Sequence, residues 1–190
     1  MRRLTYFIAS TIDGVIAGPS GEIDFYPVTE ELLAFLGSQY PETLPTHGRA
    51  ALGINSANRR FDTVIMGRAT YDPALQEGIT SPYAHLRQDV VSTSITDSPD
   101  PEVKIVSGDP VTKVRELKAE GGGLGIYLAG GSQLAGTLLP EIDEFVVKLY
   151  PVVAGAGIPL FSTGFDPTQF ELVDTQALRS GVVILTYAKT

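Results

Sequence analysis

The sequence 64-VIMGRATY-71 joins a short apolar run to the start of a helix through a single glycine. A second stretch, 127-YLAGGSQL-134, repeats this arrangement with two glycines. Apolar strands that alternate with helical segments are typical of α/β proteins with parallel strands. Ligands bind at the carboxyl ends of such strands, so both junctions are candidate binding segments. Each of them, taken alone, is also compatible with a plain strand–helix connection.

Similar signals on both sides of these stretches indicate further elements. Thr29 can cap a helix that begins with two acidic residues, and Asp109-Pro110 is a strong helix start. Residues 14–21 are expected to form a loop, and residues 39–58 a loop with some helix. Pro151 places part of the predicted strand 144–153 at an edge or bulge. The other expected strands are residues 6–9, 63–66, 89–92, 103–106 and 126–129, with an antiparallel pair over 170–175 and 182–188; a short helix is expected over 132–139.

Composition narrows the classes of function. The chain has 190 residues, 43% of them hydrophobic, and a formal net charge of −8. This charge argues against binding to nucleic acid or to an anionic membrane surface. Because cysteine is absent, a disulfide scaffold, a zinc–thiolate site, an iron–sulfur cluster and a cysteine nucleophile are excluded. The length predicts one domain over residues 1–190.

The N-terminal apolar run is interpreted as a buried strand. Ser10, Thr11 and Asp13 interrupt it, and no segment of about 18 apolar residues is present that could span a membrane. A cytoplasmic location is therefore expected. His47 and His85 have no partner at metal-ligand spacing, so no metal site is expected.

A basic stretch lies within this acidic chain. Between residues 41 and 70 the charged residues are Arg49, Arg59, Arg60 and Arg68, against Glu42 and Asp62. One interpretation is a solvated face. The other is a local pocket for a multiply charged phosphate ligand, which the helix start after Gly67 would also favour.

Four motifs in order now carry a resemblance. They are 10-STIDGVIA-17, 64-VIMGRATY-71, 128-LAGGSQL-134 and 150-YPVVAGAGIPLF-161. Together they resemble the dihydrofolate reductase-like superfamily, and more narrowly the branch that contains the reductase domain of the bifunctional riboflavin-biosynthesis deaminase/reductase. The likeness covers Leu4 to Tyr187. It implies an α/β fold with a mixed, mostly parallel central sheet, flanking helices and a C-terminal antiparallel hairpin.

The resemblance also implies a cofactor, NADPH, held across the carboxyl ends of the strands, and a cis peptide bond between Gly130 and Gly131. Members of the branch are often homodimers. By the resemblance, Ala9, Val15 and Ile16 line the nicotinamide, Gly67, Arg68, Ala69 and Thr70 meet the phosphates, Ser92, Thr93 and Ser94 lie near the adenosine 2′-phosphate with Arg68, and Gly130, Gly131, Ser132 and Gln133 pack on the pyrophosphate and nicotinamide.

Reduction of a C=N bond needs a proton source as well as a hydride. The resemblance implies that Glu31, on the helix after the first loop, supplies the proton. The alternative is that Glu31 only stabilises the helix dipole. Asp13 is the second candidate, or a water held by either residue. The alternative for Asp13 is that it fixes its loop through backbone hydrogen bonds.

The expected function is an NADPH-dependent reductase of a small, heterocyclic, pteridine- or pyrimidine-like molecule. The dihydrofolate reductases that the chain resembles carry a loop tryptophan and, after the second motif, an arginine that pairs with the glutamate tail of folate. This chain has no tryptophan and no arginine between residues 72 and 86, and this departure argues against folate as the substrate. Tyr26, Phe35, Tyr150 and Phe161 are candidates to shape the substrate cavity, or are core aromatics. Three alternatives are a non-catalytic NADP(H)-binding module, a 5-amino-6-ribosylaminouracil phosphate reductase of riboflavin biosynthesis, and a structural dimer subunit without cofactor.

Overall fold

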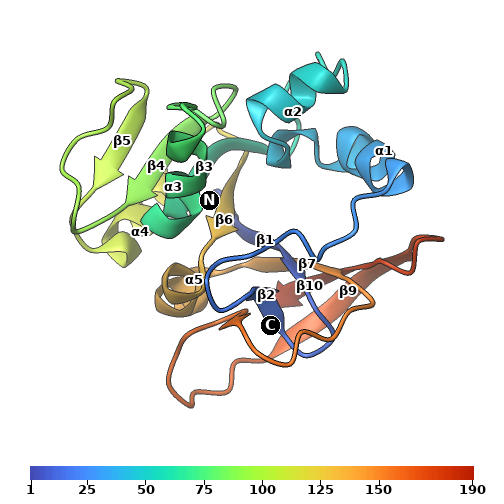
Figure 1. Ribbon diagram of the computed structural model, residues 1–190. Coiled ribbons are helices and arrows are strands. Elements are labelled where there is room, and N and C mark those ends of the chain that lie inside the picture. Colours follow the sequence, from blue (N-terminus) through green and yellow to red (C-terminus); the bar gives the residue numbers. More distant parts are fainter.

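The computed structural model describes residues 1–190 and is built around an eight-stranded sheet in the order β5-β4-β3-β6-β1-β7-β10-β9 (Figure 1). The six strands from β5 to β7 in that order are parallel, whereas β10 runs antiparallel to both β7 and β9. This confirms the mostly parallel sheet with a C-terminal antiparallel hairpin. The strands are β1 Leu4–Ser10, β3 Phe61–Gly67, β4 Arg87–Val91, β5 Val103–Val106, β6 Gly125–Gly130, β7 Glu144–Leu149, β9 Phe170–Ala177 and β10 Val183–Lys189.

Local capping chemistry positions two of the helices as expected. The Thr29 hydroxyl accepts a hydrogen bond from the Leu32 N–H at 3.2 Å, and the Asp109 carboxylate accepts bonds from Val111 and Thr112. No helix is long and apolar enough to cross a membrane. The helices are α1 Glu30–Gln39, α2 Thr46–Ala51, α3 Arg68–Gln76, α4 Pro110–Ala119 and α5 Ser132–Leu138, with short 3₁₀ turns at Pro41–Thr43 and Leu139–Glu141.

The sheet separates two apolar clusters. On one face, α1 packs through Leu32, Phe35 and Leu36 against strand residues that include Phe7 and Val146. On the other face, α4 and α5 pack against alternate residues of the same strands, such as Leu4, Tyr6 and Ile126. The alternation follows from the two-residue period of a strand. This alternation determines which side chains lie on the same face of the sheet and can therefore line the same cavity.

Strand β7 corrects the prediction for residues 144–153. It ends at Leu149 and lies in the interior of the sheet, between β1 and β10. Pro151 has no N–H to continue a ladder, so the chain leaves the sheet before it rather than forming an edge or bulge. The Tyr150 N–H still donates to the Ser10 carbonyl at 2.8 Å.

A small second sheet corrects the prediction of a loop over residues 14–21. Strand β2, Val15–Ala17, pairs antiparallel with β8, Ile158–Pro159. Gly157 makes this approach possible, because a Cβ there would lie 2.3 Å from the Ala17 carbonyl oxygen. Its φ of +152° is also in the region that favours glycine. The pairing joins segments about 140 residues apart, so no local signal predicts it.

Gly136 provides a test of the packing of α5. A Cβ at this position would lie 2.0 Å from the Ser162 carbonyl oxygen, which is backbone and cannot rotate away. We expect Gly136→Ala to lower the free energy of unfolding by about 1–3 kcal/mol, as overpacking does, despite the better helix propensity of alanine. Chemical denaturation measures the change. Gly48→Ala in α2 is the control, because its Cβ would meet only Pro45 at 3.9 Å; it should be neutral or stabilising. Equal effects of the two substitutions would contradict this account.

Candidate functional site

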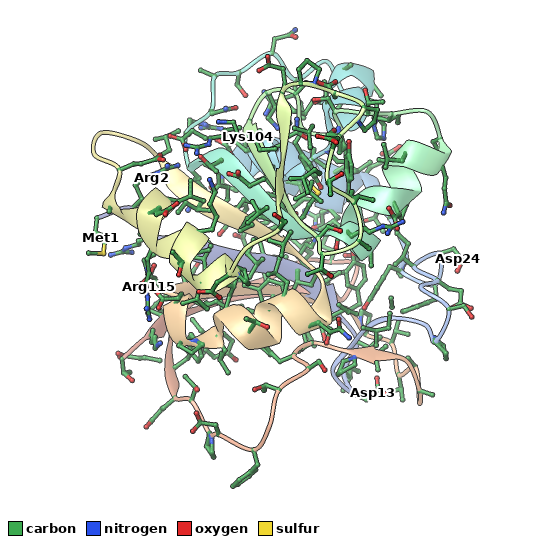
Figure 2. All side chains as sticks on the ribbon, turned by 90° about the vertical axis from the view of Figure 1, so that its left-hand side faces the viewer. Met1, Arg2, Asp13, Asp24, Lys104 and Arg115 are labelled. Atoms are coloured by element: carbon green, nitrogen blue, oxygen red, sulfur yellow. The ribbon has the colours of Figure 1, made fainter.

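The carboxyl ends of the parallel strands bring the sequence motifs to one edge of the sheet. Ser10, Gly67 and Gly130 end β1, β3 and β6, and Met66 pairs with Gly130 in the register of β3 and β6. Asp13, in the turn after β1, lies on the opposite side of the molecule from Met1 and Arg2 (Figure 2). The candidate site is therefore at the edge where ligands of open α/β sheets bind.

Glycine backbone lines the middle of this edge. A Cβ on Gly67 would lie 3.6 Å from the Gly131 nitrogen, and a Cβ on Gly130 would lie 3.5 Å from the Thr70 hydroxyl. The Gly130–Gly131 peptide bond is cis, as the resemblance implies. Next to it, the buried Ser132 hydroxyl has no hydrogen-bond partner within the chain. The arrangement leaves main-chain groups uncovered by side chains, beside one buried hydroxyl without a partner.

The start of α3 adds positive charge. Its N-cap, Gly67, offers no side chain, so the first N–H groups of this nine-residue helix have no side-chain partner. Arg68 donates to the Ser94 hydroxyl at 2.6 Å and also contacts Asp72 at 3.2 Å, with 43% of its side chain exposed. Such an exposed ion pair holds an arginine only weakly. The structure thus places Arg68 beside the segment 92–94, where a phosphate could bind.

The other three arginines of the basic stretch do not join this site, which corrects the pocket interpretation of residues 41–70. Arg49 donates to the Ser56 carbonyl, Arg59 to the Ser38 carbonyl and Arg60 to the Gln39 carbonyl. Arg60 also lies over the Tyr40 ring at 4.5 Å. These side chains tie neighbouring loops together, and Arg68 is the member of the stretch at the carboxyl edge.

The remaining residues that the resemblance assigns to the cofactor are placed as follows. Ala9 is partly buried on β1, and Val15 is buried with its carbonyl accepting the Tyr26 hydroxyl at 2.6 Å. Ile16 is partly exposed on β2. Ala69, Thr93 and Gln133 are exposed, after Arg68, Ser92 and Ser132 respectively. These residues follow or end the strands that form the edge.

Asp13 joins two of the motifs. Its carboxylate accepts the Thr11 hydroxyl at 2.6 Å and the backbone N–H groups of Ala154 and Gly155 at 3.0 and 2.7 Å. The Thr11 hydrogen bond, with the two backbone bonds, lowers the pKa of Asp13 to about 2. A carboxyl group with this pKa carries no proton near neutral pH. The geometry therefore favours the loop-fixing interpretation over proton donation.

Glu31 lies in the first turn of α1 and is partly buried. Its two oxygens accept the backbone N–H groups of Arg179 and Ser180, at 3.1 and 3.2 Å. These contacts connect α1 to the turn between β10 and β9. The sequence contains no signal for them, because the partners lie about 150 residues away.

Three of the four aromatic candidates share one face of the sheet. Tyr26 and Tyr150 lie with ring centroids 4.6 Å apart, and Phe35 belongs to the same cluster. Burial, with Tyr150 and Asp13 nearby, raises the pKa of Tyr26 to about 12, so its hydroxyl stays neutral. Phe161 does not join them: it packs on Tyr6 and Phe145 on the opposite face, because the chain crosses the edge of the sheet before it reaches residue 161.

One further charged residue, Lys148, lies in this region and was not predicted. It is partly buried on β7, on the face that carries Val146 and Tyr150. The signal available in the sequence is a lone lysine in the apolar run 145-FVVKLY-150. A charged residue at a core-facing position is uncommon unless it is paired.

Comparisons with known proteins agree with this architecture. A family model described as the RibD C-terminal domain matches residues 2–184. The uncharacterized protein YwjB of Bacillus subtilis is 30% identical over 187 residues, which cover 95% of each chain. A putative riboflavin biosynthesis protein from Shewanella sp. PV-4 is 25% identical, with a TM-score of 0.73 over 100% of this chain and 99% of that one. Dihydrofolate reductase from Enterococcus faecalis, complexed with NADP(H), shares the fold at 14% identity, with a TM-score of 0.66 over 99% and 96%.

The hydrogen bonds of Asp13 predict a pH-dependent contribution to stability. Folding lowers the pKa of Asp13 from 3.8 to about 2, so its stabilising effect is complete above the unfolded pKa and disappears as the pH falls through the folded pKa. We expect Asp13→Asn to have a lower melting temperature than the wild type at neutral pH, and the difference to shrink as the pH approaches 2. Thermal unfolding over a pH series measures this.

Asp166→Asn serves as the control, because the Asp166 carboxylate accepts no hydrogen bond and is exposed. This variant should follow the wild type at every pH. A constant gap between Asp13→Asn and the wild type from neutral to acid pH would contradict the assigned role.

Proposed function

The chain belongs to the RibD C-terminal domain family, and from this premise we propose that it is an NADPH-dependent reductase of a small heterocyclic molecule. The substrate class is a pteridine- or pyrimidine-like ring, and the reaction delivers a hydride to one of its sp² carbons. The observation that carries the proposal is the edge that combines the Gly67, Gly130 and Gly131 backbone with Arg68 and Ser94. The NADP(H) complex of dihydrofolate reductase, a protein of the same fold, supports it.

The groups at this edge fit a phosphate-rich dinucleotide. In the proposal, residues 67–70 hold phosphate at the start of α3, and Arg68 with Ser92–Ser94 holds the 2′-phosphate. In the same proposal, the bare backbone of Gly130 and Gly131 packs on the pyrophosphate and nicotinamide, with Ser132 and Gln133 next to it in the chain. Ala9, Val15 and Ile16 complete the nicotinamide side. NADPH supplies the hydride when it is bound.

The chain must also provide a proton. We assign this role to Glu31, or to a water held by it, as the resemblance implies, because Asp13 is committed to its loop by the hydrogen bonds from Thr11, Ala154 and Gly155. Glu31 is partly buried in the first turn of α1, next to Leu32, which packs toward the sheet. Its two backbone hydrogen bonds fix the carboxylate in position. Tyr26, Phe35 and Tyr150 would form the apolar walls that orient the substrate ring.

Cofactor binding is the first test. We expect NADPH to bind the wild type and to raise its melting temperature, with fluorescence transfer to the bound nicotinamide. Arg68→Ala should weaken NADPH binding by about tenfold or more, the scale of a charge-assisted hydrogen bond, and weaken NADH binding far less. Titrations of the wild type and Arg68→Ala with each nucleotide measure these changes.

Arg3→Ala is the matched control, since Arg3 is exposed at the start of β1, at the opposite edge of the sheet. It should bind both nucleotides as the wild type does. Failure of the wild type to bind NADPH would refute the proposed function. An equal loss of NADPH and NADH binding in Arg68→Ala would refute only the 2′-phosphate role.

The proton-donor role of Glu31 predicts a separation of binding from turnover. Glu31→Gln should retain NADPH affinity within about twofold but lose most of the oxidation of NADPH, because an amide has no acidic proton to give. The assay follows loss of reduced nicotinamide absorbance with 5-amino-6-ribosylaminouracil 5′-phosphate and with dihydropteridines. Unchanged turnover across pH would remove Glu31 as the donor. Glu30→Gln is the control, because Glu30 is exposed and makes no side-chain hydrogen bond.

A further inference from the structure

Lys148 occupies the part of the sheet that lies under α1. It pairs in register with Ala9 of β1 and with Ile184 of β10. Its ammonium group lies 4.8 Å from the centre of the Phe7 ring, and Phe7 in turn packs on Tyr40 with ring centroids 4.7 Å apart. Phe7, Tyr40 and Phe35 belong to one apolar cluster with Tyr150. The ammonium group therefore lies over one aromatic ring at the edge of this cluster, and Lys148 is beside the proposed nicotinamide contact Ala9 on the neighbouring strand.

The ammonium group of Lys148 makes no hydrogen bond or salt bridge within the chain. Other lysines differ in this respect. Lys118, which is buried, donates to the Glu141 carbonyl and to Asp143, and Lys113 pairs with Asp89 at 3.3 Å. A buried cation is costly unless it is paired, and a nearby aromatic ring offsets only part of that cost. Burial lowers the pKa of Lys148 to about 8, which leaves the group mostly protonated at neutral pH.

These properties define which ligand atom could act as the hydrogen-bond partner of the Lys148 ammonium group. An ammonium group has three donors and no acceptor, so its partner must be an acceptor oxygen. The Phe7 ring below it, with the apolar cluster to which Phe7 belongs, suits a flat ring rather than a free phosphate, and one lysine cannot neutralise a phosphate dianion. The matching group is an oxo oxygen on a heterocycle.

We propose that Lys148 binds the substrate by donating a hydrogen bond to a ring oxo group, and so makes the site specific for oxo-substituted over amino-substituted rings. This inference rests on the proposed reductase function, whose site it extends with a specificity-determining residue. An amino group at the same ring position would bring donor against donor. The preference for an oxo group over an amino group therefore follows from hydrogen-bond donor and acceptor chemistry and does not depend on the shape of the ring.

The experiment uses a matched pair of probes. In 5,6-diaminouracil the two ring oxo groups take the places that amino groups occupy in 2,4,5,6-tetraaminopyrimidine. Ligand-observed NMR titration of the full chain, with and without NADPH, should show that the wild type prefers the uracil by about tenfold or more. Lys148→Met should abolish this preference, Lys148→Arg should keep part of it, and Lys104→Met should not alter it. Lys104 lies on β5, at the far end of the sheet (Figure 2).

Two further readouts separate this inference from a structural role and from the reductase proposal. Lys148→Met should melt at the same temperature as the wild type or higher, because it removes an unpaired, partly buried charge. It should also bind NADPH like the wild type. A lower melting temperature, or a preference for the uracil that survives in Lys148→Met, would overturn the role of Lys148 while leaving the reductase proposal intact. Absence of NADPH binding in the wild type would refute the reductase proposal. In that case the titration of the two probes without cofactor would still test whether Lys148 sets the preference for oxo groups.

Discussion

The parallel pairing of β1 with β6 on one side and β7 on the other is the constraint on which the site depends. Parallel strands deliver all their carboxyl ends to the same edge, so Tyr150 bonds to Ser10 and Gly130 lies beside Ile8 although they are far apart in the chain. The same pairing places alternate residues of β1 and β7 under α1. The edge supplies the bare glycine backbone and the residues proposed to bind phosphate, and the face supplies the aromatic side chains and Lys148.

Asp13 stabilises this edge from outside the sheet. Its carboxylate bridges the turn after β1 to Ala154 and Gly155, while Gly157 allows β8 to approach β2. The loop that the resemblance assigns to the nicotinamide is thus held by hydrogen bonds from the last motif of the chain. A low pKa follows from this structural role, and it leaves proton transfer to another group.

Features with a local cause were predictable from the sequence. The caps at Thr29 and Asp109, the strand Val103–Val106 and the C-terminal antiparallel pair depend on nearby residues and were expected. The misses involve contacts between distant segments. The β2–β8 pairing and the interior position of β7 are of this kind, and so is the packing of Phe161 on the far face of the sheet. No residue near them in the chain carries the information, because long-range register is set by which segments find each other.

By itself, the sequence determined the α/β class, the order of the four motifs and the absence of cysteine chemistry, because composition, glycine placement and strand–helix alternation are local properties. The tertiary structure alone decided which charged groups act together. In the folded chain Arg68 donates a hydrogen bond to Ser94. Arg49, Arg59 and Arg60 instead donate to loop carbonyls. Lys148 has no charged or hydrogen-bonding partner under α1 and contacts the Phe7 ring. The physical reason is that the energy of a charge depends on its burial and its partners, and both are set by folding.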